Sequence, residues 1–438
     1  MRKLQVLSVL ALIFAAGIHG QSPLLPVTLP ERGDFYRDPA TKNRVWRVTD
    51  EKLCPGGAKH YYSYVPVWNQ TGTHLVVACL RGQSVVPLLM DAKSFEVVGD
   101  AGRGAPGLNA ERLTWSWKDP NLLYGFNESE VWQVNPFTRK GKRIFSLRSP
   151  VLKDRTLRAL RLAYISFDDR LALVELQGPV PERGDRNPWN VVGLATVEIA
   201  TGKIVGQMEV VGMGYDEAVF TKDNRVWLVT REDSYRYEPD FSKRIRVANH
   251  GHHAHGLLPN GTPVAVKEAS DRACPPGTVS GNPADKDYPR GGWKPTATLL
   301  NQLVESKGTP KTPPIESEIF MVGCNVPGLH NYSHFSWNHE QRDRFFLSSG
   351  SYGNAPADPT AHAILRVRLE FSGDRVASDS IDVLAHHRTR GNNYWASPRP
   401  SCNMQATRCL FASTMSVQVT NAPGSVQLYV VDVPELSR

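Results

Sequence analysis

Short runs of alternating apolar and polar residues, separated by turn residues, recur along most of the chain. In residues 61–98 these runs read YSYVPVW, HLVVACL, VVPLLMD and FEVV, with NQTGT between the first two. Alternation with a period of two over four to eight residues is typical of β-strands, and Asn, Gly and Thr between runs are typical of turns. The pattern predicts four short strands in this stretch.

The same order of strands returns six times after the first unit. The later units span residues 112–147, 159–209, 215–247, 252–324, 330–383 and 394–433. Repeated four-stranded units predict an all-β fold, a β-propeller with seven blades. Units of about 60 residues exceed the usual length of about 40–45, which indicates long loops. Residues 44–49, which follow a turn, are predicted to close the ring as an N-terminal outer strand of the last blade.

The longest insertion, residues 267–314, is predicted to contain a short helix over residues 296–307. Its apolar residues follow helical spacing, and Gly308 comes just after the last turn. We expect this helix to cover or support one rim of the propeller. The alternative is a loop without regular structure. The apolar residues of the predicted helix are Leu299, Leu300, Leu303 and Val304.

Residues 1–20 have the features of a secretory signal peptide. Arg2 and Lys3 precede an apolar run over residues 6–18, and small or polar residues follow. The run is shorter than the ~20 residues that a transmembrane helix needs. We therefore expect cleavage, a secreted or periplasmic protein with no membrane span, and a single propeller domain over residues 21–438. An uncleaved anchor is the alternative.

Six cysteines in an exported chain can pair as disulfides. Cys402 and Cys409 flank a short polar segment between two β-like runs, so they are predicted to close a hairpin. No cysteine has the spacing of a zinc site. Three pairings stay open for the other four, which are Cys54, Cys79, Cys274 and Cys324.

The chain is basic, with 51 Lys and Arg against 43 Asp and Glu and a formal charge of +8. Basic residues are concentrated in residues 139–161 and 243–246. For an exported protein, this charge favours an acidic oligosaccharide or polysaccharide as the partner over a nucleic acid. A protein partner stays open as well. The alternative is a solvated basic face that binds no ligand.

The central channel of a propeller is lined by the innermost strand of each blade, so polar side chains near the starts of these strands are candidates for a functional site. His253 and His255 are two residues apart, which places both on one face of a strand, where they can share a metal ion or an anion. His252 points the other way. The collected positions are His60, Tyr62, Arg112, Arg158, Arg161, Tyr215, Glu217, His253, His255, Tyr332, His334, Tyr394 and Arg399.

Substrate-binding roles are predicted for four of these positions. Arg112 and Arg161 can each hold a carboxylate through two hydrogen bonds, or can form ion pairs between blades instead. The histidines can bind substrate, or can be hydrogen-bonding groups between blades. The four candidates are His60, Arg112, Arg161 and His253.

Two segments near the N-terminus resemble a known family. Residues 38–50, DPATKNRVWRVTD, and residues 64–78, YVPVWNQTGTHLVVA, are similar to the start of the oligogalacturonate lyases and related TolB-like propellers. The resemblance extends in weaker form over the rest of the chain. In that family, one His and a Gln-x-x-His-x-His run hold a manganese ion, and an Arg acts as base. His334 matches the first ligand. Where the Gln and the two His would be, this chain has Tyr394, Ser397 and Arg399.

The resemblance implies cleavage of uronate-containing glycans by β-elimination. A divalent metal such as manganese is its implied cofactor, with His334 as the one matching ligand position. Arg399 could replace the ion by neutralising the substrate carboxylate. This arrangement is similar to the ulvan-type lyases, which use His and Tyr as acid and base. The candidate base is then His334 or His255, and the candidate acid is Tyr332 or Tyr394. The alternative function is a non-catalytic propeller that binds a glycan or a protein.

Overall fold

The structure is a computed structural model of the whole chain. It describes residues 24–148, 157, 159–179, 190–231, 233–246, 252–269, 294–299, 319–322, 332–349, 362–372, 375–389 and 396–435. The predicted signal peptide lies outside these ranges. None of the helices in the described ranges is long and apolar enough to cross a lipid bilayer.

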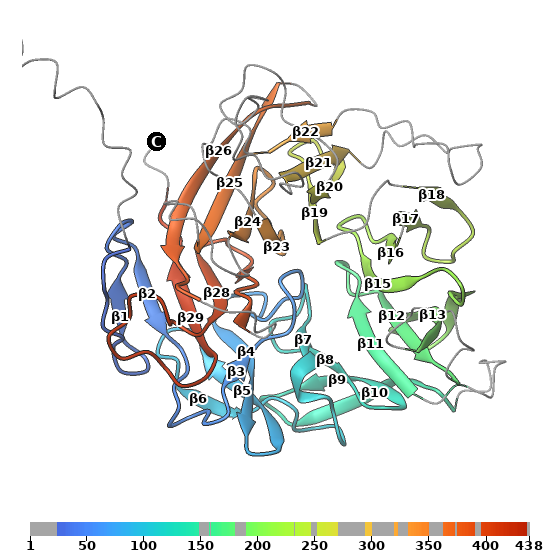
Figure 1. Cartoon of the computed structure of the whole chain (residues 1–438). Helices are drawn as coiled ribbons and strands as arrows, with labels where there is room; N and C mark the ends of the chain where they lie inside the picture. Colours follow the sequence, from blue (N-terminus) through green and yellow to red (C-terminus); the bar gives the residue numbers. More distant parts are fainter. Residues whose placement is uncertain are drawn as a thin grey trace, which may run out of the picture.

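The chain folds into an all-β propeller, whose sheets are arranged around a central axis (Figure 1). Six of the described sheets have four antiparallel strands each. Their strands are β3 (Ala58–Lys59), β4 (His74–Arg81), β5 (Ser84–Asp91), β6 (Val97–Asp100); β7 (Thr114–Trp115), β8 (Leu123–Phe126), β9 (Glu130–Asn135), β10 (Lys140–Ser146); β11 (Ala159–Ile165), β12 (Leu171–Gln177), β13 (Val191–Glu198), β14 (Ile204–Glu209); β15 (Tyr215–Phe220), β16 (Val226–Thr230), β17 (Ser234–Tyr237), β18 (Arg244–Arg246); β19 (His253–Leu257), β20 (Pro263–Ala269), β21 (Lys294–Leu299), β22 (Ile319–Met321); β23 (Tyr332–Ser336), β24 (Arg344–Ser349), β25 (Ala363–Ser372) and β26 (Arg375–His386).

One further described sheet joins the two ends of the chain. Its order is β1 (Phe35–Arg37), β2 (Arg44–Arg47), β29 (Gln427–Asp432), β28 (Arg408–Ser413) and β27 (Ser401–Cys402). The predicted N-terminal closure is therefore confirmed. The prediction of seven blades of four strands each is wrong, because six sheets have four strands and the closing sheet has five. The extra strand is present because the N-terminal segment enters as a hairpin, with β1 paired to β2.

The inner strands all run in the same direction along the axis. Figure 1 shows β11, β15, β19 and β23 on the inner sides of their sheets. One mouth of the channel therefore lies where these strands begin, and the other lies where they end. We call them the strand-start mouth and the strand-end mouth.

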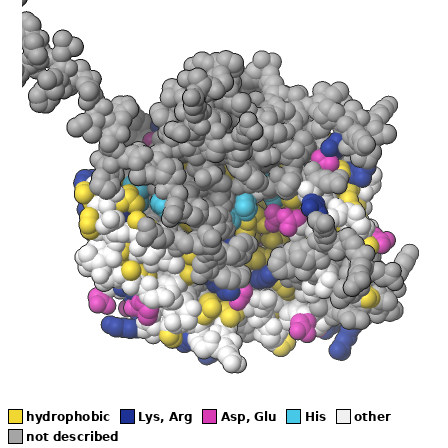
Figure 2. Space-filling model, in the orientation of Figure 1, with side chains coloured by type: hydrophobic (Ala, Val, Ile, Leu, Met, Phe, Trp, Pro, Cys, Tyr) yellow, Lys and Arg dark blue, Asp and Glu magenta, His cyan; other side chains and the backbone are white. Residues whose placement is uncertain are grey.

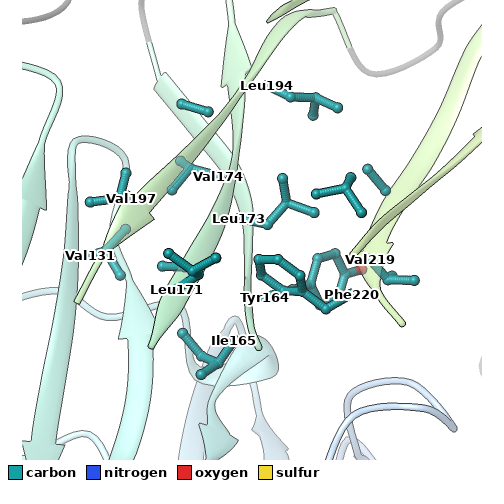
Figure 3. Close-up of a cluster of buried hydrophobic side chains, with 14 of the residues drawn as sticks. Val131, Tyr164, Ile165, Leu171, Leu173, Val174, Leu194, Val197, Val219 and Phe220 are labelled. Carbon is teal, nitrogen blue, oxygen red and sulfur yellow. The ribbon is translucent and has the colours of Figure 1, made fainter. Parts of the chain in front are cut away.

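The core lies between neighbouring sheets. In β12, residues 171–176 are all buried, because adjacent blades cover both faces of this strand. Figure 3 shows Leu173 and Val174 of β12 in the same cluster as Tyr164 of β11 and Phe220 of β15. Each such side chain contributes about 1.5–3 kcal/mol when it is fully buried. The blade-to-blade contacts thus fix the inner strands that line the channel.

Hydrogen bonds between blades also tie together the turns at the strand-end mouth. In these turns, an amide of one blade bonds a polar oxygen of the next. Such bonds join Trp117 to Asp169, Asp168 to Asn224, Glu340 to Met404, and Gln405 to Gln70. The side chains carried by these turns are therefore held on a fixed rim.

Two local predictions have different outcomes. The predicted Cys402–Cys409 disulfide is confirmed, and a second disulfide joins Cys54 to Cys79. The start of the predicted helix over residues 296–307 is wrong, because β21 (Lys294–Leu299) is a strand paired with β20. Backbone pairing along β20 overrides the helical spacing of the leucines there. The rest of the predicted helix lies outside the described residues.

Candidate functional site

A loop rich in tyrosine begins near the strand-start mouth and runs along the channel toward the other mouth. After β3, residues 60–66 (HYYSYVP) leave the strand, and pairing resumes with the bridge between Trp68 and Leu75. The carbonyl of Val65 accepts hydrogen bonds from Asn338 Nδ2 at 3.3 Å and Ser401 Oγ at 3.1 Å. These bonds anchor the loop to two blades that are distant from it in the sequence. We call residues 60–66 the tyrosine loop.

Tyr62 of this loop contacts residues from blades that come much later in the sequence. Its ring centre is 5.2 Å from Cζ of Arg399 and 5.3 Å from the ring of His334. The ring of His252 lies 4.3 Å from that of His334 and 6.4 Å from that of Tyr62. A phenol, a guanidinium and two imidazoles therefore meet at one point of the mouth.

Tyr64 contacts a different pair of blades. Its hydroxyl donates a hydrogen bond to Glu217 of β15, and its ring stacks on His253 of β19 at 5.4 Å. Burial, Glu217 and the neighbouring tyrosines raise the pKa of Tyr64 well above 10. Tyr64 is therefore a phenol that keeps its proton at neutral pH. The third tyrosine, Tyr61, stacks on Tyr164 at 5.9 Å.

His334 and Arg399 both have backbone angles that are rare for residues with a side chain. Their φ values are +57° and +45°. His334 is the extra residue of a β-bulge, because Ser333 pairs with Ser348 and Phe335 with Leu347. A β-bulge changes the direction of a side chain. A residue with a side chain in this region of φ destabilises the folded state by roughly 1–3 kcal/mol, and such residues cluster at functional sites.

A hydrogen bond joins His334 to Ser397. The distance from Ser397 Oγ to His334 Nδ1 is 2.9 Å, and both side chains are buried. Burial, with the charges of His252, Arg399 and His60, lowers the pKa of His334 well below 6.5. His334 is therefore a neutral imidazole at neutral pH, held in place through one ring nitrogen.

His60 belongs to the same cluster. It is buried, and burial together with the Arg399 charge lowers its pKa to about 3, against the carbonyl of Pro398. Four of the candidate positions collected from the sequence thus lie together, namely His60, Tyr62, His334 and Arg399. Arg112 stands beside the tyrosine loop, with Cζ 5.9 Å from the ring of Tyr61. It belongs to a short 3-10 helix, η1 (Ala110–Arg112).

His253 and His255 lie on one face of β19, as their spacing predicts. Their ring centres are 4.9 Å apart, and both side chains are buried. His253 Nδ1 is 3.6 Å from Glu217 Oε1. His255 is further along the strand, where it contacts Trp227 and lines a cavity in the channel. His255 is thus deeper in the channel than the His334 cluster.

Several predicted site residues are outside what the structure describes. Arg158 and Tyr394 lie outside the described residues. For Arg161 and Tyr332, the backbone is described but the side chain is not. Their roles therefore stay predictions.

The residues at this mouth do not fit the manganese site that the family resemblance implies. The side chains that the structure describes contain no group of three or more His, Cys, Asp or Glu placed to hold a metal ion. Beside His334 stand a serine hydroxyl and the Arg399 guanidinium, which carries a fixed positive charge. A cation at this position would be repelled by Arg399.

Sequence reasoning missed Tyr64 and underestimated His252. His252 does point away from His253 and His255, but this direction brings it to His334. The signal for the tyrosine loop was the run HYYSY, which breaks the alternation of its strand. Figure 2 shows histidine and acidic side chains close together near the middle of one face of the molecule.

Comparison with solved structures shows the same fold in oligogalacturonate lyases. One, from Vibrio parahaemolyticus, is 14% identical, with a TM-score of 0.60 over 94% of this chain and 99% of its own. Another, in complex with manganese, is 15% identical, with a TM-score of 0.59 over 94% of this chain and 98% of its own. No protein-family profile matches the chain. No curated protein sequence matches it either.

Proposed function

We propose that this protein is an exported lyase that cleaves uronate-containing oligosaccharides or polysaccharides by β-elimination without a metal ion. The observation that carries the proposal is the meeting of Arg399, His334 and Tyr62 at the strand-start mouth. They supply a cation, a neutral imidazole and a phenol, which are the three groups that this reaction needs.

Arg399 binds the uronate carboxylate in this proposal. The proton next to a carboxylate is a very weak acid, so its removal needs a cation that stabilises the negative charge developing on the carboxylate. A guanidinium can hold both carboxylate oxygens at once. Arg399 thus performs electrostatically the task that a metal ion performs in a metal-dependent lyase.

His334 is the proposed base. When its Nδ1–H donates to Ser397 Oγ, the lone pair of Nε2 can accept the proton from the carbon next to the carboxylate. Burial, together with the charges of His252 and Arg399, lowers the pKa of His334 in the free protein. A substrate carboxylate bound to Arg399 offsets this charge, so the imidazole becomes more basic when substrate is present.

Tyr62 is the proposed acid. As His334 takes the proton, the released electron pair forms the carbon–carbon double bond, the bond to the glycosidic oxygen breaks, and that oxygen takes the phenol proton of Tyr62. Tyr332 and Tyr394 were the sequence candidates for this role, and they stay alternatives. His60, His253 and Arg112 remain proposed substrate-binding residues, and Arg161 is proposed with them from the sequence.

A binding protein without turnover is the second candidate function. The observation that favours it is the low exposure of His334 at 0% and of Arg399 at 4%, which gives a polymer little direct access to them. A protein of this kind would hold glycans through the half-buried tyrosines and leave them intact.

An ultraviolet assay separates these functions. The full chain is incubated with oligogalacturonate, ulvan and unsulfated chondroitin, with and without EDTA, and the absorbance of the unsaturated product is followed. We expect product from at least one glycan, at the same rate in EDTA. A rate that EDTA abolishes and manganese restores would contradict the metal-free mechanism. Flat traces with all glycans, together with measurable retention of one of them, would support the binding protein instead.

Variants then assign the roles. Tyr62→Phe keeps the ring beside Arg399 but removes the acid, so kcat is expected to fall about 100-fold or more. Arg399→Lys keeps the positive charge but loses the planar guanidinium that binds both carboxylate oxygens, so KM for the glycan is expected to rise. Tyr61→Phe is the matched control within the same loop. Equal activity of Tyr62→Phe and Tyr61→Phe would remove Tyr62 from the mechanism.

A further inference from the structure

A second cluster of charged and aromatic groups lies at the strand-end mouth, opposite the proposed active site. Lys222 follows the end of β15, and its Nζ is 4.2 Å from the ring centre of Phe167 and 5.0 Å from that of Trp117. Phe167 and Trp117 follow β11 and β7 in the same way. The cavity that His255 lines also contacts both rings.

The two rings form a fixed seat for the ammonium group. Their centres are 4.1 Å apart, and Trp117 Nε1 donates a hydrogen bond to the carbonyl of Ile165 at 3.2 Å. The turn of Trp117 is bonded to Asp169 at 3.1 Å. Aromatic faces attract an ammonium group but do not neutralise its charge. The two rings therefore hold the ammonium group of Lys222 in place, but they leave its positive charge without a negative counter-charge.

Several other charged groups near this mouth already have partners. Asp223 pairs with Arg225 at 2.6 Å and with Arg236, and Arg344 pairs with Asp343 at 2.8 Å. Asp168 and Asp169 accept hydrogen bonds from the turns. Among the described residues, Lys222 forms no ion pair. Glu340 and Lys118 act on it only at longer range, with opposite signs.

His339 provides a second polar group at this mouth. Its side chain is 1% exposed, and neither ring nitrogen meets the geometry of a hydrogen bond within the described part of the chain, although the backbone of Gln341 interacts with the ring. Burial, Lys222 and Arg344 lower its pKa well below 6.5, against the backbone of Gln341. His339 is therefore a neutral imidazole at neutral pH, with an N–H that can donate to an anion.

We propose that Lys222 and His339 form an oxyanion-binding site at the strand-end mouth, which takes a carboxylate or a sulfate group and is separate from the Arg399 site. The bound oxygens would receive a charge-assisted hydrogen bond from the ammonium group and a neutral one from the imidazole. The anion supplies the negative charge that the aromatic rings beside Lys222 do not provide. Lys118 is a second cation near Lys222, and Glu340 is a nearby carboxylate whose charge acts in the opposite sense.

Anion binding at this site should depend on pH, because it is coupled to the protonation of Lys222. Burial and Lys118, against Glu340, lower the pKa of Lys222 to about 7. The anion binds the protonated amine and raises its pKa, so binding takes up a proton at and above this pH. Affinity should be highest below pH 7 and should fall as the pH rises through 7. An ordinary exposed lysine would show no such change between pH 6 and pH 8.

Calorimetric titration of the full chain with sulfate and with glucuronate at pH 6, 7 and 8 tests the proposal. The titrations are repeated in Arg399→Gln, which removes the anion site of the other mouth. We expect Kd to rise about tenfold from pH 6 to pH 8 in both proteins. Tighter binding of glucuronate would assign a sugar carboxylate, and tighter binding of sulfate would assign an inorganic anion. No saturable binding at any pH would overturn the site.

Two substitutions of Lys222 assign the binding to this residue. Lys222→Met should abolish the pH-dependent binding, whereas Lys222→Arg should keep binding and lose its pH dependence, because Arg stays charged. Lys118→Met is the matched control and should keep the pH dependence. Unchanged binding in Lys222→Met would contradict the proposal. If that variant fails to fold, an unaltered pH dependence in Lys222→Arg contradicts it equally.

Discussion

His386 and Asp38 form a buried pair although 348 positions separate them in the sequence. The backbone N–H of His386 donates to Asp38 Oδ2 at 3.0 Å, and its Nδ1 lies 3.2 Å from the same oxygen. Asp38 also accepts the amides of Ala40 and Thr41 in the turn between β1 and β2. This carboxylate therefore fastens the N-terminal hairpin, which closes the ring, to β26 of the neighbouring blade.

Asp38→Asn should weaken the ring closure in a pH-dependent way. Burial alone would raise the pKa of Asp38, but the bonds and charge of His386 and the Thr41 amide lower it from 3.8 to about 2. A depressed pKa contributes stability that is present above about pH 4 and is lost as the pH falls toward 2. At pH 7, the substitution is expected to lower the free energy of unfolding by about 2 kcal/mol.

Urea unfolding at pH 7 and pH 2.5, followed by tryptophan fluorescence, measures this effect. The difference between wild type and Asp38→Asn should shrink at the lower pH. Glu96→Gln, an exposed carboxyl group, is the control and should show no such change. A difference of the same size at both pH values would mean that the charge of Asp38 contributes nothing.

Ser397→Ala tests whether this hydroxyl positions His334. Loss of the 2.9 Å bond leaves the imidazole free to rotate, because Ser397 holds its Nδ1. We expect kcat for glycan cleavage to fall about tenfold with little change in KM, which corresponds to about 1.4 kcal/mol in the barrier. Ser397→Thr should restore much of the rate. A rise in KM with constant kcat would assign Ser397 to substrate binding instead.

Gly256→Ala should disturb the contact between the blades of β19 and β23. A Cβ atom at Gly256 would lie 2.3 Å from Cδ2 of Trp337, whose side chain is fully buried. Overpacking of this kind costs about 1–3 kcal/mol. We expect a lower thermal midpoint by scanning calorimetry. Gly99→Ala is the control, because nothing lies within 4 Å of its added Cβ, and an equal loss there would exclude the steric explanation.

The two described disulfides should contribute unequally to stability. Cys54–Cys79 closes a loop with a sequence separation of 25, and Cys402–Cys409 one of 7. In the chain-entropy account, the longer loop stabilises the fold by about 1 kcal/mol more. Paired Cys→Ser variants, compared by urea unfolding, measure the difference. An equal or reversed order would show that native-state contacts outweigh loop entropy here.

Much of the fold could be predicted from local patterns. The strands and turns follow from alternation and turn residues, and the closure by residues 44–49 follows from an extra strand before the first full unit. The strand count of the closing sheet could not be predicted, because in the described residues β1 is an edge strand that pairs with β2. The helix prediction failed at β21 for a similar reason, since pairing with a partner strand outweighs local spacing.

The site could be predicted only in part. The sequence placed His60, His334 and Arg399 near the starts of inner strands, and the structure brings them together. His255 was given the same possible role as His334, but it lies deeper in the channel. No sequence motif identifies Tyr64 or the Lys222 cluster, because the role of each depends on contacts with several other blades.

Local sequence patterns account for the repeating strands, one hairpin disulfide and the residue types available at the channel. These features depend on neighbours in the chain, so a local pattern records them. Which side chains meet depends on the packing of the complete fold. The bulge at His334, the left-handed backbone at Arg399 and the path of the tyrosine loop direct these groups to one point. Packing between distant blades stabilises such conformations, and that packing has no signature in any single stretch of sequence.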